Sequence, residues 1–104
     1  DCNHGQGLAV IHPAYYRHIL KDAEEKFTRF AKEVFGKDTA EEGLEALTAF
    51  IEGCGLPTKL GQLKSKVEIT PEVLRKVADT CNIIKCGPRE LSRDEIYDIL
   101  LECR

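Results

Sequence analysis

Residues 8–19 read LAVIHPAYYRHI, and their spacing decides the fold class. The apolar side chains that recur with a 3.6-residue period are Leu8, Ile11, Tyr15 and Ile19. Pro13 interrupts this run, so it either lies in the first turn of a helix or kinks a helix already under way. The stretch therefore predicts an amphipathic helix that buries the face carrying these four side chains.

Similar helical patterns follow along the chain. A second helix is expected after Asp22, ending at Gly36, with an apolar face made of Phe27, Phe30, Ala31 and Val34. Thr39 and Glu42 have the spacing of a capping box, in which the hydroxyl and the carboxylate each accept from a free amide at a helix start. The third apolar stripe is Leu44, Leu47 and Ile51, and Gly53 or Gly55 is expected to end that helix. The acidic pairs Glu24–Glu25 and Glu41–Glu42 suit helix starts, where they complement the dipole.

The second half of the chain has equally clear helix signals. Leu56–Pro57 predicts a connector, followed by a short turn around Leu60–Leu63. Thr70–Pro71 predicts a helix start, with an apolar face of Val73, Leu74, Val77, Ala78 and Cys81. Ser92 and Glu95 form a second capping box, before a last helix lined by Ile96, Leu100 and Cys103. We therefore expect an all-α chain of five or six short helices, with residues 1–104 forming a single helical domain.

Composition excludes several classes of protein. The 104 residues carry a formal net charge of −3, which does not suit a protein that binds nucleic-acid phosphates. No apolar run approaches the roughly 20 residues that span a bilayer, so no membrane partner is expected. The five cysteines are odd in number and irregularly spaced, which favours free thiols and a reducing, cytoplasmic setting. The sequence has no methionine and begins with Asp1, from which we expect a piece cut from a longer protein.

Spacing alone does not define a reactive site. His4, His12 and His18 are separated by eight and six residues, whereas a helical metal pair needs three or four. His4 and His12 would lie about 12 Å apart along a helix, too far to share one ion. His18, close to Lys21, is expected in solvent. No nucleophile elbow, phosphate-binding loop or dinucleotide fingerprint occurs, so the residues by themselves assign no catalytic or cofactor-binding group.

The stretch NHGQGLAVIHP, residues 3–13, resembles a signature of the iron-containing alcohol dehydrogenases. In that family a His-Gly pair is followed by small and apolar residues and by a proline nine positions after the histidine, as His4 and Pro13 are here. Further similar pieces are residues 29–31, 34–36, 55–57 with Leu60 and Leu63, and 91–100. Their order and spacing are most similar to the butanol dehydrogenase branch, and the resemblance covers residues 3 to about 101.

The resemblance implies a fold and a function. Family members have a cofactor-binding α/β domain followed by a helical metal-binding domain of the dehydroquinate synthase-like type, and this chain resembles the C-terminal part of the latter. The resemblance implies that His4 is one of the metal ligands, the others (one Asp and two His) lying upstream in the family, and that His12 is an ordinary partly buried residue. It implies Fe²⁺ or Zn²⁺ with NAD(P)H, hydride transfer between a primary alcohol such as butanol and its aldehyde, and a homodimer or larger assembly of the whole enzyme.

Three interpretations of the sequence stay open. A dehydrogenase fragment is expected to be inactive alone and to expose an apolar face where other helices would pack, which would also allow it to associate with itself. A non-enzymatic helical interaction module would instead have a covered core and bind no metal. A small zinc protein would use Cys2, His4 and another cysteine, although no suitable ligand spacing is present.

Overall fold

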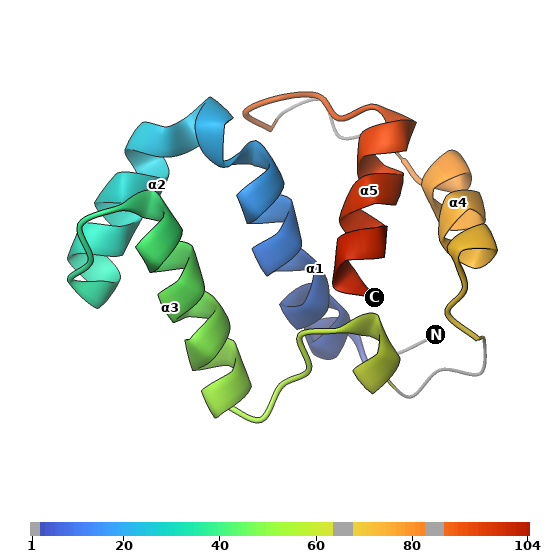
Figure 1. Cartoon of the computed structure of the whole chain (residues 1–104), viewed down its shortest axis with the longest axis horizontal. Helices are drawn as coiled ribbons and strands as arrows, with labels where there is room; N and C mark the ends of the chain where they lie inside the picture. Colours follow the sequence, from blue (N-terminus) through green and yellow to red (C-terminus); the bar gives the residue numbers. More distant parts are fainter. Residues whose placement is uncertain (1–2, 64–67, 83–86) are drawn as a thin grey trace.

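Helix α1, His4–Ile19, runs through the middle of the computed structural model, between α3 and α5 (Figure 1). The structure describes residues 3–63, 68–82 and 87–104. Within these ranges the chain is helical and has no strand, which confirms the expected all-α class. None of the described helices is both long enough and apolar enough to cross a membrane.

The element order follows the predicted helix signals, with differences at the bounds. After α1 come a 3₁₀ turn, η1 (Leu20–Ala23), helix α2 (Glu24–Phe30) and a π-helical turn, η2 (Ala31–Phe35). Helix α3 is Ala40–Gly53, the 3₁₀ turn η3 is Leu60–Gln62, α4 is Pro71–Thr80 and α5 is Arg93–Cys103. The single helix expected after Asp22 thus consists of two consecutive segments, α2 and η2. Gly36, with φ of 66°, ends it in the left-handed conformation that glycine adopts without strain.

Helix starts were predicted well because their signals are local. Thr70 accepts a hydrogen bond from the Val73 amide at 3.3 Å, directly before Pro71. Ser92 and Glu95 form the complete capping box, with both reciprocal bonds at 3.2 Å. At α3 only half of the expected box is present. Thr39 accepts from the Glu42 amide, but the Glu42 carboxylate accepts from the Thr39 hydroxyl at 3.0 Å instead of from a free amide.

The main core lies along α5, which packs on α1 on one side and on α4 on the other. Its buried members are Val10, Ala14, Leu60, Leu74, Ala78, Ile99, Leu100 and Cys103. A smaller cluster of Leu20, Ala40 and Leu44 joins the end of α1 to α3. Cys103 packs as a small hydrophobe, as predicted, and burial raises the pKa of its thiol. Cys81 is only partly buried and lies just beyond α4, so its placement on that helix was wrong.

Several apolar side chains expected in the core are exposed. On α1 the buried face is centred on Val10 and Ala14, whereas Leu8 is 42% and Ile11 39% exposed. Val34 is 59% exposed because it lies in the π-helical turn, whose wider spacing rotates it away from the face set by Phe27. Val77 is 46% exposed because α4 packs on α5 along a narrow stripe through Leu74 and Ala78.

The helices form a thin slab. The molecule measures 39 × 31 × 18 Å, so its shortest dimension is less than half of its longest. Its radius of gyration of 14.3 Å exceeds the value of about 13 Å expected for a compact domain of this length. Viewed down the shortest dimension, α3, α1, α5 and α4 lie side by side in that order, so that α1 and α5 each have a helix on either side (Figure 1).

Gly43 allows α3 to approach the π-helical turn, and its replacement by alanine should destabilise the chain. A Cβ at position 43 would lie 2.4 Å from the Ala31 Cβ and 2.9 Å from the Ala31 Cα, so the backbones must separate. We expect Gly43→Ala to lower the free energy of unfolding by about 1–3 kcal/mol in urea denaturation. Gly53→Ala is the control on the same helix. A Cβ at position 53 would meet open space, so we expect Gly53→Ala to raise the free energy of unfolding by up to about 1 kcal/mol. A change in the same direction for both variants would contradict the close packing of Gly43 on Ala31.

Candidate metal centre

Helix α1 begins at the candidate ligand itself. The Asn3 side chain accepts a hydrogen bond from the Gln6 amide at 3.2 Å, and the Asn3 carbonyl accepts from the Gly7 amide at 3.0 Å. Asn3 is thus the N-cap, and His4 is the first helical residue, four positions before the expected start at Leu8. The apolar pattern did not predict this cap because Gly5 and Gly7 weaken the pattern before Leu8, although an asparagine before an apolar run is itself a start signal.

His4 is exposed at this helix end and therefore accessible to a metal ion. Across the described residues, no group of three or more His, Cys, Asp or Glu side chains is close enough to hold an ion. An exposed imidazole suits Fe²⁺ or Zn²⁺ as a single ligand, but one imidazole is not a site. His4 accordingly fits such a metal only if other ligands come from outside these ranges. Cys2, which the zinc-protein alternative requires, lies outside the described residues.

The other two histidines have different roles. His12 is partly buried, as expected, and its Nδ1 donates to the Leu8 carbonyl at 2.8 Å, since a carbonyl can only accept. The prediction that His18 lies in solvent was wrong. Its Nε2 lies 2.8 Å from a carboxylate oxygen of Glu95, on α5. The sequence could not show this pair because 77 residues separate its members.

Glu95 is the centre of a charged network that joins α1 to α5. Its carboxylate accepts from His18, from the Ser92 amide and from Arg89, and Arg89 also donates to Asp22 at 2.9 Å. These hydrogen bonds, that from His18 foremost, lower the pKa of Glu95 from 4.5 to about 2. The network lies at the opposite end of α1 from His4. Its hydrogen bonds and ion pairs connect α1 to α5, so its role is structural.

The lowered pKa of Glu95 predicts a pH dependence of stability. The Glu95 carboxyl binds its proton more weakly in the folded chain than in the unfolded chain. Its contribution to the free energy of unfolding is therefore complete above pH about 4.5 and is lost as the pH falls towards 2. Glu95→Gln should remove this part of the acid dependence, measured as the difference in unfolding free energy between variant and wild type across that range. Glu90→Gln, at an exposed position in the preceding loop, is the control. A Glu95→Gln difference that is constant with pH would contradict the prediction.

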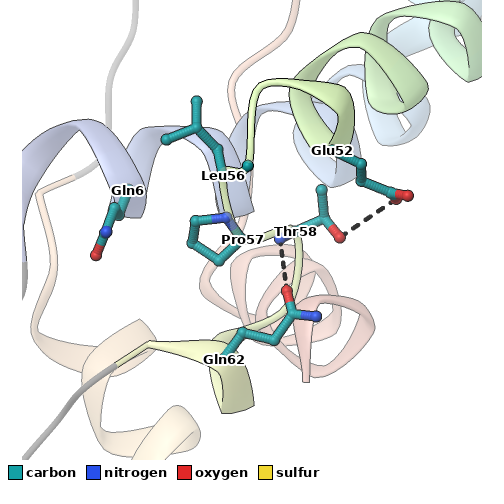
Figure 2. A pocket seen from close by; sticks show the side chains of 7 residues that line it. Gln6, Glu52, Leu56, Pro57, Thr58 and Gln62 are labelled. Carbon is teal, nitrogen blue, oxygen red and sulfur yellow. Dashed lines mark hydrogen bonds between the residues drawn. The ribbon is translucent and has the colours of Figure 1, made fainter.

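A polar pocket adjoins the first turn of α1. The pocket lies between α1, the end of α3, η3 and the connector that joins α3 to η3. The residues that line it are Gln6, Glu52, Gly55, Leu56, Pro57, Thr58 and Gln62. Figure 2 shows Thr58 between Glu52 and Gln62, with Gln6 across the Leu56–Pro57 connector. The Thr58 amide donates to Gln62 at 2.9 Å and its hydroxyl to Glu52 at 3.4 Å. These hydrogen bonds tie the connector to α3 and to η3, and the pocket lies between the connector and Gln6 in the first turn of α1.

Two glycines, Gly5 and Gly7, follow His4, and glycine lets other groups approach the backbone closely. A Cβ at Gly5 would lie 3.4 Å from the Asn3 Oδ1, which is ordinary van der Waals contact. Contacts among the residues that the structure describes therefore do not require glycine at position 5.

Comparisons with known proteins agree with this helical arrangement. The model of the Fe-containing alcohol dehydrogenase family, C-terminal, matches residues 1–103. A probable NADH-dependent butanol dehydrogenase 1 from Bacillus subtilis is 32% identical over 87 residues, which are 76% of this chain and 21% of that protein. The crystal structure of NADH-dependent butanol dehydrogenase A from Thermotoga maritima superposes with a TM-score of 0.80 at 26% identity. That match covers 96% of this chain and 28% of the other.

The chain thus spans roughly a quarter of the length of these relatives. The family match extends over nearly all of its residues, and the structural match covers the helices on both sides of α1. The stretch that begins at His4 and ends at Pro13 lies inside the matched region. This chain belongs to the Fe-containing alcohol dehydrogenase family and corresponds to the family's C-terminal part.

Proposed function

We propose that this chain is the C-terminal part of a metal-dependent and NAD(P)-dependent dehydrogenase that interconverts a primary alcohol, such as butanol, with its aldehyde. The observation that carries the proposal is the position of His4, an exposed imidazole at the first residue of α1, within a family match over residues 1–103. The names of the two butanol dehydrogenases support the alcohol as substrate and NADH as reductant.

In this proposal His4 is one ligand of a divalent metal, and the remaining ligands come from the polypeptide that precedes this part in the family. The metal, when bound, supplies Lewis-acid polarisation of the alcohol or aldehyde oxygen. The chain's own contribution is to hold one ligand. Neutral imidazole binds the metal, and the Asn3 cap fixes the first turn of α1, so that the His4 backbone has a defined position.

The 104 residues alone are proposed to be inactive, because a single ligand and no cofactor-binding domain cannot carry out hydride transfer. The cofactor supplies the redox chemistry in such enzymes, and the protein must position it against the substrate. No group in the described part of the chain is assigned a catalytic or cofactor-binding role.

The test is NADH- or NADPH-dependent reduction of butyraldehyde by the chain in continuity with the polypeptide encoded before it. With added Zn²⁺ or Fe²⁺ we expect turnover that a chelator abolishes, and none from the 104-residue chain under the same conditions. Absence of turnover with either metal and either cofactor would overturn the proposal and favour the helical interaction module. Turnover that a chelator leaves unchanged would overturn the metal dependence.

A further inference from the structure

The first turn of α1 has few features of its own that favour a helix. Gly5 and Gly7 lie in this turn, and glycine is among the least favourable residues in a helix because it loses the most backbone freedom on folding. The turn carries no acidic side chain to complement the helix dipole. Residues 4–6 are exposed, and the first buried residue of α1 is Ala9. Within the described part of the chain, neither helix propensity nor burial therefore explains why α1 begins at His4.

Asn3 supplies stabilisation that this turn otherwise lacks. Its Oδ1 accepts from the Gln6 amide at 3.2 Å, and its carbonyl accepts from the Gly7 amide at 3.0 Å. Its backbone, with φ of −61° and ψ of 128°, is extended, as is typical of an N-cap residue. The side-chain bond satisfies one of the amides that have no partner within the helix.

The candidate ligand lies inside the loop that this bond closes. The bond joins Asn3 to Gln6, so the two residues between its ends are His4 and Gly5. Without the cap, no side-chain bond keeps the backbone at His4 helical, and the turn can fray, as helix ends do. A frayed turn moves the His4 backbone and the imidazole with it. The Asn3 side chain therefore acts on the position of the imidazole through the backbone.

We infer that Asn3 is a positioning residue for His4, and that its cap raises the affinity of the site for a divalent metal. The inference rests on the proposed function in taking His4 as a ligand. A site whose ligand is in place for only part of the time binds its ion more weakly by that fraction. Loss of the cap should therefore appear as weaker metal binding, although Asn3 is not itself a ligand.

The test is a titration with Co²⁺, whose visible absorption spectrum reports binding, of this chain in continuity with the polypeptide encoded before it. Asn3→Ala removes the cap, whereas Asn3→Ser keeps an N-cap side chain of similar strength with a different chemical group. Thr39→Ala is the matched control, because Thr39 accepts from the Glu42 amide at the same distance of 3.2 Å at the N-cap of α3. That cap lies at the opposite end of α3 from Glu52, which lines the pocket beside the first turn of α1. His4→Ala measures how much of the Co²⁺ binding depends on the imidazole.

We expect Asn3→Ala to weaken Co²⁺ binding about three- to ten-fold, and Asn3→Ser and Thr39→Ala to bind Co²⁺ within about two-fold of the wild type. Equal affinities of Asn3→Ala and the wild type, with a loss in His4→Ala, would overturn the inference and leave His4 as a ligand. Equal losses in Asn3→Ala and Asn3→Ser would also overturn it, since the amide would then contact the metal directly. An equal loss in Thr39→Ala would assign the effect to overall stability instead. Unchanged affinity in His4→Ala would refute both the ligand role in the proposed function and the positioning role.

Discussion

In the longer polypeptide, His4→Ala is expected to lower metal affinity by at least about 10–100-fold, the range found when groups merely supporting a ligand are removed. The imidazole is exposed at the first position of α1, so its loss removes a donor without opening the core. Metal content per protein after dialysis against a weak chelator measures the effect, and butyraldehyde reduction should fall in parallel.

His12→Ala is the matched control for this prediction. It removes an imidazole from the same helix, two turns further on, at a residue whose Nδ1 already bonds to the Leu8 carbonyl. It should therefore retain the metal. Unchanged occupancy in His4→Ala, or equal losses in the two variants, would contradict the role assigned to His4.

Leu74→Ala is expected to cause the largest loss of stability among the substitutions considered. Leu74 is 3% exposed on α4 and belongs to the main core, which joins α4 to α1 and α5. Truncating a buried leucine removes transfer free energy and leaves a cavity, so we expect a loss of about 2–5 kcal/mol. For a domain with total stability of roughly 5–15 kcal/mol, such a loss is large.

Val77→Ala provides the comparison, since it removes methyl groups from an exposed position one turn along the same helix. Its effect should stay within about 0.5 kcal/mol, as for ordinary surface substitutions. Urea denaturation followed by far-UV circular dichroism measures both variants. Equal losses would mean that α4 does not pack on α5 through Leu74.

The Gly53→Ala control and the Leu74 result bear on different parts of the slab. Gly53 ends α3, which packs on α2 and on one side of α1, whereas α4 lies on the other side of α1, beyond α5 (Figure 1). Leu74 belongs to α4 and to the main core. The effects of the two substitutions should be additive in a double variant, because the two residues share no contacts in the described clusters.

Local signals in the sequence predicted the class of fold and most helix starts. Thr70–Pro71 and Ser92 with Glu95 were correct because a cap satisfies amides only two or three residues away. The same reasoning failed for Leu8, Ile11, Val34 and Val77. Periodicity shows which side chains share a face, but which face is covered depends on elements far along the chain.

The candidate metal centre, too, could be predicted only in part from the sequence. The sequence by itself determined an all-α chain and, through residues 3–13, its family, which the family match confirmed; His4 as a metal ligand stays a prediction. Only the tertiary structure decided that Asn3 caps α1 at His4, that His18 pairs with Glu95, and that a polar pocket lies beside the first turn of α1. Caps and periods are short-range properties of the chain, whereas ion pairs and pockets require residues that only folding brings together.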